Sequence, residues 1–187
     1  EAEQTQSVNT IILSNDNLVG HNTDILGFEK AIKNLNFDMR GKKIFILGAG
    51  GVVPSIIFAL NKMNAAKIIV SNRTKNKAEE LKSRFLNLDV LDWGNITDFD
   101  VIINATSLGL NEETINLDFL KSTNNKLFYD VIYNPVETNF LKEAKKLGNK
   151  TENGKLMFVY QAVEAFKLWH GIEPQINNEA LEILNND

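Results

Sequence analysis

The feature that most constrains the fold is an uncharged run, Ile44 to Leu60, with the sequence IFILGAGGVVPSIIFAL. Its length approaches the roughly 18 to 20 residues of a membrane-spanning helix, but glycines and Pro54 interrupt it. The run instead predicts a buried strand over 43–47, a glycine-rich turn, and a helix from about Val53 to Met63. Pro54 suits the first turn of this helix, where the amide proton that it lacks would have no partner.

Apolar strands and helices alternate beyond this run. Because strands joined by helices pair in parallel and are covered on both faces, the pattern predicts an α/β fold, a Rossmann-like doubly wound parallel sheet, over about residues 36–152. The expected strands cover 67–71, 89–91, 100–104 and 127–132, and the expected helices cover 75–85 and 137–147.

Two flanking segments lie outside this unit. Near the start of the chain we expect strands over 10–13 and 18–19, and then a helix from Thr23 to about Leu35 with Thr23 or Asp24 as its N-cap. Near its end we expect helices over 155–169 and 177–184. The sequence contains no repeat and no low-complexity tract.

Composition excludes several classes of function. The chain has no cysteine and only two histidines, His21 and His170, far apart in sequence, so we expect no metal site. A net charge of −4 argues against nucleic-acid binding, which needs clustered basic residues. The polar first ten residues lack a targeting signal, and we expect a cytoplasmic protein that does not bind membranes.

A glycine-rich segment, Gly48-Ala49-Gly50-Gly51, follows the first buried strand and opens a helix. Glycines in this position let the backbone turn tightly and approach a pyrophosphate, whose charge the helix N-terminus stabilises. Val53 occupies the place of the third glycine of the dinucleotide-binding pattern, so the pattern is incomplete. The segment predicts a dinucleotide site, with a purely structural turn as the alternative.

The next strand ends in Asn72-Arg73-Thr74, and Lys77 follows closely. Sites that prefer NAD place an acidic side chain here to bind the ribose 2′-hydroxyl. No acid is present, and Arg73 can pair with a 2′-phosphate and stack on adenine. The segment therefore favours NADP, the alternative being a solvated basic turn.

Three further polar groups occupy suggestive positions. Residues 104–109 (NATSLG) end a buried strand, and their small side chains suit the close approach of a cofactor, although a plain turn would look similar. Gln161 lies among apolar residues of a helix and must find a polar partner. Asp24, taken alone, is more typical of a helix cap than of a catalytic group. Residues 133–135 form an expected loop.

Seven stretches together resemble the shikimate dehydrogenase family. They occur in the family's order along essentially the whole chain, and the combination is far more specific than any single member. The stretches are SVNT (7–10), GHNTDILGF (20–28), ILGAGG (46–51), SNRT (71–74), INATSLG (103–109), YDVIYNPVET (129–138) and NGKLMFVYQAVEAFKLWHG (153–171).

The resemblance implies an NADP-dependent enzyme that reversibly reduces 3-dehydroshikimate to shikimate, in the biosynthesis of chorismate and the aromatic amino acids. It implies a small-molecule substrate, the cofactor NADP, no metal, and an assembly that can be a homodimer. It also implies three parts of the chain: residues 1–35 as a remnant of the substrate domain with a connecting helix, 36–152 as the NADP-binding domain, and 153–187 as helices that return to the substrate domain.

The resemblance also implies roles for individual residues. Asn9 and Asp24 would bind substrate hydroxyls, with Asp24 as the acidic half of a catalytic Lys–Asp pair, and Tyr133 and Gln161 would face the substrate. The implied cofactor residues are Gly48, Ala49, Gly50 and Gly51 at the pyrophosphate, Asn72, Arg73, Thr74 and Lys77 at the 2′-phosphate, Thr106 and Ser107 along the cofactor, and Val131 and Gly154 beside the nicotinamide.

Two motifs of the family are absent from these 187 residues: a serine-rich substrate motif and the N-V-T-x-P-x-K segment that carries the catalytic lysine. We therefore expect this chain alone to be catalytically incomplete. We also expect the helices over 23–35 and 155–185 to expose apolar faces and to promote self-association. A smaller departure is Val52-Val53-Pro54, where the family often has small residues.

Three alternatives remain at this point. One is a quinate/shikimate dehydrogenase with relaxed cofactor choice, which the lack of an acid beside Arg73 disfavours. Another is a non-catalytic NADP-binding module. A third, a glutamyl-tRNA-reductase-like domain, shares the glycines and Asn72-Arg73-Thr74 but leaves Asn22-Thr23-Asp24 and the helix around Gln161 unexplained.

Overall fold

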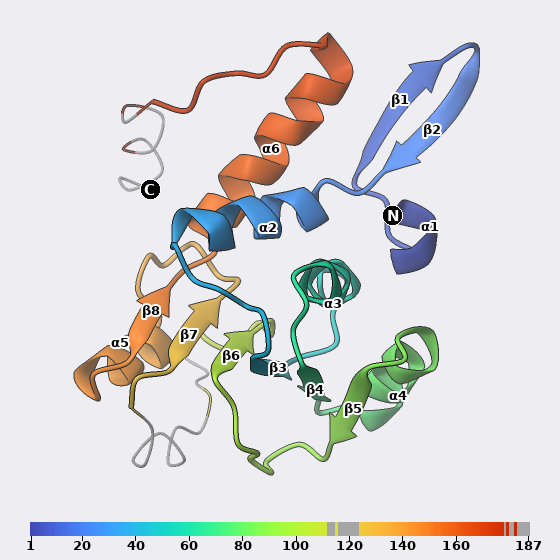
Figure 1. The fold of residues 1–187 in the computed structure, drawn as a ribbon. Coiled ribbons are helices and arrows are strands. Elements are labelled where there is room, and N and C mark those ends of the chain that lie inside the picture. Colours follow the sequence, from blue (N-terminus) through green and yellow to red (C-terminus); the bar gives the residue numbers. More distant parts are fainter. Residues whose placement is uncertain (112–114, 116–123, 178, 180–181, 183–187) are drawn as a thin grey trace.

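A computed structural model describes residues 1–111, 115, 124–177, 179 and 182 of the chain. Six parallel strands form one sheet in the order β5-β4-β3-β6-β7-β8 (Figure 1). Chain order reverses between β3 and β6, as in the doubly wound folds that bind dinucleotides. The predicted fold class is confirmed. The strands are β3 (Lys43–Leu47), β4 (Lys67–Ser71), β5 (Leu88–Leu91), β6 (Val101–Asn104), β7 (Leu127–Asp130) and β8 (Lys150–Glu152).

Helices cover both faces of the sheet, which explains why its central strands are apolar on both sides. Along β3, Ile44 and Ile46 point into one core and Phe45 and Leu47 into the other, following the alternation of a strand. The first core includes side chains of α2 (Asp24–Asn34), α3 (Val53–Lys62), α4 (Lys75–Arg84) and α6 (Lys155–His170), and the second includes side chains of α5 (Asn139–Lys146).

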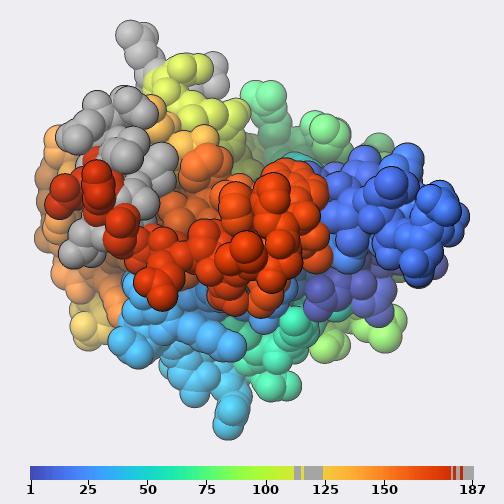
Figure 2. All heavy atoms as spheres, turned by 90° about the horizontal axis from the view of Figure 1, so that it is seen from above, coloured from blue at the N-terminus to red at the C-terminus, as the bar shows by residue number. Residues whose placement is uncertain are grey.

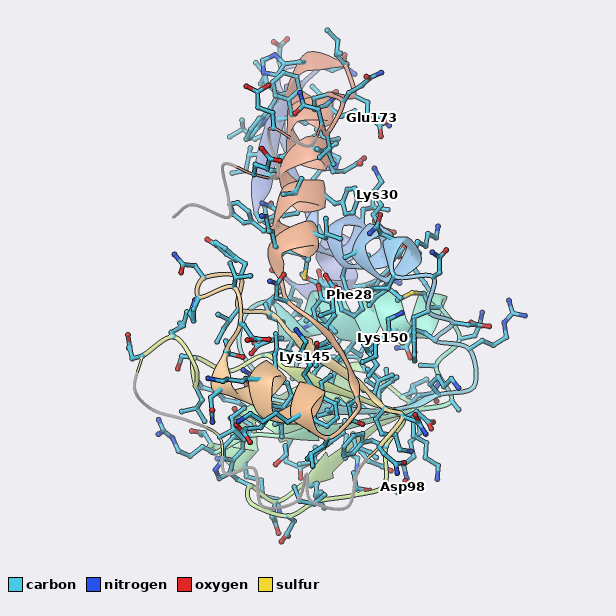
Figure 3. The ribbon with its side chains drawn as sticks, turned by 90° about the vertical axis from the view of Figure 1, so that its left-hand side faces the viewer. Phe28, Lys30, Asp98, Lys145, Lys150 and Glu173 are labelled. Atoms are coloured by element: carbon cyan, nitrogen blue, oxygen red, sulfur yellow. The ribbon has the colours of Figure 1, made fainter. Side chains whose placement is uncertain are left out.

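Helices α2 and α6 lie across one another above the sheet (Figures 1 and 3). Gly27 makes this close crossing possible, because a Cβ there would lie 2.8 Å from the carbonyl oxygen of Met157. The apolar side chains on the packed face of α2, Ile25, Phe28, Ala31 and Ile32, are at most 1% exposed, whereas Leu26 on another side of the helix is partly exposed. The expectation that the helix over 23–35 exposes an apolar face is therefore wrong, since α3, α6 and the sheet cover that face within the same chain.

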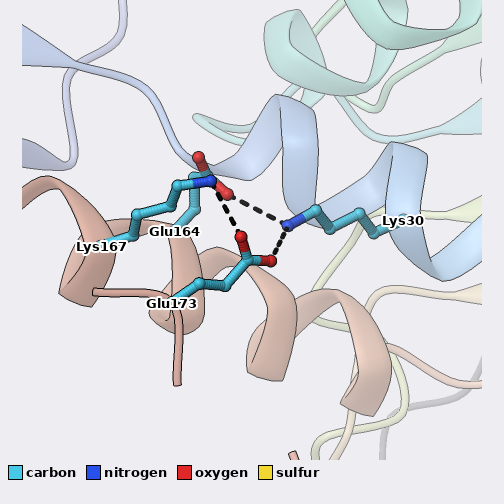
Figure 4. Close-up of polar contacts among 4 residues, drawn as sticks. All are labelled: Lys30, Glu164, Lys167 and Glu173. Atoms are coloured by element: carbon cyan, nitrogen blue, oxygen red, sulfur yellow. Dashed lines mark hydrogen bonds and ion pairs between the residues drawn. The ribbon is translucent and has the colours of Figure 1, made fainter. Parts of the chain in front are cut away.

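Four charged residues connect α2 to α6 and to the segment that follows it (Figure 4). The Nζ atom of Lys30 lies 3.2 Å from Glu164 Oε2 and 3.4 Å from Glu173 Oε1, while Lys167 Nζ lies 2.9 Å from Glu173 Oε2. The helix expected over 177–184 falls mostly on residues outside the described part of the chain.

A two-stranded hairpin extends from the body of the molecule (Figures 1 and 2). Its strands, β1 (Thr10–Ser14) and β2 (Asn17–His21), are antiparallel and longer than predicted. Asn15 and Asp16 both have positive φ, the conformation of a two-residue type I′ turn. Apolar side chains are exposed here, among them Leu13 at 71% and Leu18 at 78%, and also near the end of α6 at Trp169.

Some boundaries differ from prediction for local reasons. The helix expected from residue 137 begins at Asn139, because the Thr138 hydroxyl caps it by accepting a hydrogen bond from the Leu141 backbone N–H. A short first helix, α1 (Ala2–Thr5), and the polar edge strand β8 were not predicted. Among the described residues, no helix combines the length and apolar character that a membrane crossing requires.

Candidate functional site

A pocket of about 350 Å³ opens at the carboxyl ends of the central strands. Its volume lies within the range of small-molecule sites, and its place at the reversal of strand order is where doubly wound sheets bind ligands. Nine of the predicted cofactor residues line it. The lining residues are Gly48, Ala49, Gly50, Asn72, Arg73, Thr74, Lys77, Trp93, Ala105, Thr106, Ser107 and Leu108.

The turn after β3 requires glycine at position 48. Gly48 has a φ of +108°, and a Cβ there would lie 2.5 Å from the carbonyl oxygen of Ala105. Its backbone N–H donates to the Ser71 carbonyl, so the turn also continues the pairing with β4. Gly51 does not line the pocket, and a Cβ there would meet nothing within 4 Å. The close approach of backbone to the pocket is therefore made at Gly48 and Gly50.

Asn72 links this turn to the end of β4. Its side-chain oxygen accepts a hydrogen bond from the Ala49 backbone N–H at 3.1 Å, and its amide donates to the Thr74 carbonyl at 2.8 Å. Arg73 and Lys77 are exposed at the pocket, and neither pairs with a carboxylate in the part of the chain that the structure describes. Two uncompensated positive charges thus stand where a dinucleotide site carries its ribose.

A buried network holds the loop after β6. The Asn104 side-chain oxygen accepts from the Thr106 backbone N–H and hydroxyl, and the Asn104 amide donates to Asp130 Oδ1 at 3.0 Å. The Thr138 hydroxyl donates to Asp130 Oδ2 at 2.6 Å. Burial raises the pKa of Asp130, against the lowering effect of its hydrogen bonds. This network (Asn104, Asp130 and Thr138) shapes the loop that brings Thr106 and Ser107 to the pocket.

A second group of predicted residues meets where the hairpin, α2 and α6 join. Asn9 Nδ2 donates to Asp24 Oδ1 at 3.0 Å, and Asn9 Oδ1 accepts from the Thr23 backbone N–H at 2.9 Å. The Thr23 hydroxyl lies 3.3 Å from Gln161 Oε1, and Gln161 Nε2 donates to the Phe158 carbonyl. Asn9, Thr23, Asp24 and Gln161 are called the Asp24 cluster below.

The start of α2 confirms Thr23 as the N-cap residue, but without a capping hydrogen bond from its side chain. The Thr23 side chain lies instead within hydrogen-bond reach of Asn9 and Gln161. The Asn22 side-chain oxygen accepts from the Asp24 backbone N–H in its place. The Asp24 carboxylate is left half-buried, and desolvation raises its pKa although the hydrogen bond from Asn9 lowers it.

The remaining predicted residues lie at the end of β7 and the start of α6. Gly154 donates its backbone N–H to the Ile132 carbonyl, and a Cβ there would collide with the Val131 carbonyl. Tyr133 stacks on Phe158 with ring centroids 4.5 Å apart. None of Val131, Gly154 and Tyr133 lines the strand-end pocket. Gly154 and Gln161 are seven residues apart on α6, which corresponds to about 10 Å.

The sequence patterns assigned no function to two features of this region. Trp93 lines the pocket from the turn after β5, and Asp130 organises the loop after β6. Asn104 and Asp130 each end an apolar strand with a polar side chain, and this sequence pattern could have indicated the network. Within the described residues, no group of three or more His, Asp or Glu side chains could hold a metal ion.

Comparison with known proteins identifies the family. Residues 29–135 match the family model for shikimate / quinate 5-dehydrogenase, and residues 156–177 match the model for the shikimate 5′-dehydrogenase C-terminal domain. The chain belongs to the shikimate dehydrogenase family. A shikimate dehydrogenase (NADP(+)) from Pelagibacter ubique is 53% identical over 186 residues, which cover 99% of this chain and 70% of that relative.

Two solved structures of similar proteins share the overall fold. A shikimate dehydrogenase in complex with NADP+ is 34% identical, with a TM-score of 0.82 over 99% of this chain and 67% of that one. A quinate dehydrogenase from Corynebacterium glutamicum in complex with NAD is 28% identical, with a TM-score of 0.88 over 98% of this chain and 69% of that one. The chain thus spans about two thirds of the length of its relatives.

Proposed function

We propose that the strand-end pocket binds NADP(H) and that the chain is the cofactor-binding part of a shikimate dehydrogenase. That enzyme reversibly reduces 3-dehydroshikimate to shikimate with NADPH. The observation that carries the cofactor assignment is the pair Arg73 and Lys77, which line the same pocket as the Gly48 turn and have no carboxylate partner among the described residues.

The fit of the pocket to the cofactor rests on its shape and charge. Gly48 lacks the Cβ that would collide with Ala105, so the turn can pack closely on the loop after β6. The turn then leads into the N-terminus of α3, where backbone N–H groups suit a pyrophosphate. A guanidinium binds phosphate oxygens in a bidentate geometry, which suits Arg73 to the 2′-phosphate. In this proposal the pyrophosphate lies at Gly48, Ala49, Gly50 and Gly51, the 2′-phosphate at Asn72, Arg73, Thr74 and Lys77, the middle of the cofactor along Thr106 and Ser107, and the nicotinamide at Val131 and Gly154.

We assign the Asp24 cluster to the substrate. Asn9, Asp24 and Gln161 supply amide and carboxylate groups that suit a polyhydroxylated ring, and Tyr133 would complete this side of the site. NADPH supplies the hydride, and the ketone oxygen then gains negative charge that a proton donor must neutralise. The role of Asp24 in this step is to hold a lysine ammonium beside that oxygen, while Asn9 fixes the carboxylate.

The family's lysine motif is absent from the 187 residues, and none of the ion pairs among the described residues joins Asp24 to a lysine. We therefore expect the 187-residue chain to bind cofactor without turning over substrate. The division into residues 1–35, 36–152 and 153–187, the homodimer and the cytoplasmic location also stay predictions.

Calorimetric titration of the 187-residue chain with NADP+ and, in parallel, NAD+ tests the cofactor assignment. We expect saturable binding that favours NADP+ by at least about tenfold, because charged hydrogen bonds to the 2′-phosphate contribute about 1.5 to 3 kcal/mol. Arg73→Ala should sharply reduce this preference, with a much smaller effect on NAD+ binding than on NADP+ binding. Arg40→Ala, which changes an arginine that does not line the pocket, is the control.

A second candidate is a dehydrogenase of relaxed cofactor choice that also accepts quinate. The structural similarity to a quinate dehydrogenase solved with NAD favours it. Equal affinity for the two cofactors, unaffected by Arg73→Ala, would support this candidate and refute the role given to Arg73. Failure of both cofactors to bind the unaltered chain would refute the assignment of the pocket.

A further inference from the structure

Trp93 is the one aromatic residue among those that line the strand-end pocket. Its side chain is not packed into either core of the sheet, and the residue is 38% exposed. A tryptophan usually buries most of its large apolar surface. An indole left open to solvent beside Arg73 and Lys77 is therefore available to a flat apolar group of a ligand.

The turn that carries Trp93 is well defined. The Asn95 backbone N–H donates to the Asp92 carbonyl at 3.1 Å, and Gly94 has a φ of +91°. A positive φ at the third position of such a turn is typical of type II, where glycine is preferred. Trp93 therefore occupies the second position, at the tip of the turn.

This turn is also attached to the loop that carries Arg73. The Asp92 carboxylate lies 2.7 Å from Nζ of Lys75, the first residue of α4, two residues after Arg73. The hydrogen bond to Asp92 raises the pKa of Lys75. Both ends of this ion pair adjoin pocket residues, so the pair links the turn that carries Trp93 to the loop that carries Arg73, although both side chains are more than half exposed and hold the two only weakly.

The order of the strands indicates which part of a dinucleotide would reach this turn. The sheet runs β5-β4-β3, with the Gly48 turn at the end of β3, Arg73 at the end of β4 and Trp93 just after β5. A pyrophosphate at β3 and a ribose 2′-phosphate at β4 leave the base, which is attached to that ribose, on the side of β5.

We propose that Trp93 is a binding residue for the adenine ring, which stacks on its indole while Arg73 binds the adjoining 2′-phosphate. The inference rests on the proposed NADP site and adds a residue that recognises the base. Bases of any kind stack on aromatic side chains. Trp93 therefore contributes affinity for the adenosine half of the cofactor and none for the nicotinamide half.

The chain contains a natural control for this residue. Its other tryptophan, Trp169, does not line the pocket, and its indole N–H donates to the Ile11 carbonyl of the hairpin at 3.0 Å. Trp169→Phe leaves Trp93 as the sole tryptophan fluorophore. We expect NADP+ and adenosine 2′,5′-bisphosphate to quench the emission of this variant saturably, and nicotinamide mononucleotide to leave it unchanged.

Calorimetry on substituted chains measures the contribution to affinity. Trp93→Ala should weaken binding of NADP+ and of adenosine 2′,5′-bisphosphate by about tenfold, which corresponds to about 1.4 kcal/mol. Trp93→Phe, which keeps an aromatic face, should stay within about threefold of the unaltered chain, and Trp169→Phe should not change the affinity. The far-ultraviolet circular dichroism of each variant reports whether it folds. If Trp93→Ala does not fold, the affinity of Trp93→Phe and the fluorescence of the Trp169→Phe variant test the proposal instead.

The outcomes separate this inference from the proposed function. If the unaltered chain binds NADP+ and Trp93→Ala binds it equally well, the role of Trp93 is refuted and the cofactor site stands. Trp93→Phe binding as weakly as a folded Trp93→Ala would also refute stacking. If the unaltered chain binds no NADP+, both proposals fail together.

Discussion

The substitution Gly48→Ala would test whether the turn after β3 depends on a missing side chain. A non-glycine residue at a φ of +108° is strained by about 1 to 3 kcal/mol. The added Cβ would also lie 2.5 Å from the Ala105 carbonyl oxygen and 2.8 Å from its carbonyl carbon. Carbon and oxygen atoms in contact normally lie about 3.5 Å apart, so backbone must move by roughly 1 Å, and such overpacking costs about 1 to 3 kcal/mol.

Together these two effects predict that Gly48→Ala lowers the free energy of unfolding by about 2 to 6 kcal/mol, a large part of the roughly 5 to 15 kcal/mol of a typical domain. The matched control is Gly51→Ala, three residues further along, where a Cβ would meet nothing within 4 Å. Its effect should stay within about 1 kcal/mol. Urea unfolding followed by circular dichroism measures both free energies. If the two variants were equally stable, the steric argument would be refuted.

Two further predictions concern the buried network and the Asp24 cluster. Thr138→Val removes the hydroxyl that donates to the buried Asp130 carboxylate and caps α5, so it should lower the free energy of unfolding by about 1.5 to 3 kcal/mol. Thr74→Val is the control, because Thr74 is exposed and its side chain makes no capping hydrogen bond. It should change the free energy of unfolding by less than about 0.5 kcal/mol. Asn9→Ala should raise the pKa of Asp24 further, because the substitution removes the hydrogen bond from Asn9, which in the unaltered chain lowers that pKa. A raised pKa in the folded state favours the protonated carboxyl. The stability contributed by Asp24 is therefore fully present below pH 3.8 and is lost as the pH rises through the folded-state pKa. In the variant this loss should occur at a higher pH. Titration of the Asp24 carboxyl by NMR measures the shift, and an unchanged pKa would contradict the role of Asn9.

The sheet could be predicted because its strands are short apolar runs that alternate with helices. Residues that surround the pocket were also predictable, since polar and glycine residues at the carboxyl ends of parallel strands converge at one edge. The role of Asp130 was not predictable without knowing that β6 and β7 are neighbours, because its partner Asn104 is 26 residues away.

Other features escaped prediction for different reasons. Strand β8 has the sequence KTE, which lacks an apolar pattern, because it lies at the edge of the sheet. The apolar face of α2 was recognisable, but its coverage by α3 and α6 depends on a helix crossing that Gly27 permits. Trp93 follows a strand of only four residues, and its place in the pocket depends on the turn formed by Asp92, Gly94 and Asn95.

Two glycines fix α6 at separate points along its length. At its start, Gly154 touches the Val131 carbonyl at the end of β7, and further along, Gly27 of α2 touches Met157 and Gln161. Because α6 is rigid and is held at both contacts, it fixes the distance between the proposed nicotinamide position and the Asp24 cluster. A displacement of about 1 Å between reacting groups can slow a reaction about a hundredfold. A larger side chain at Gly27, which the proposed ligands do not contact, would therefore shift α6 and change the distance between the proposed nicotinamide position and the Asp24 cluster.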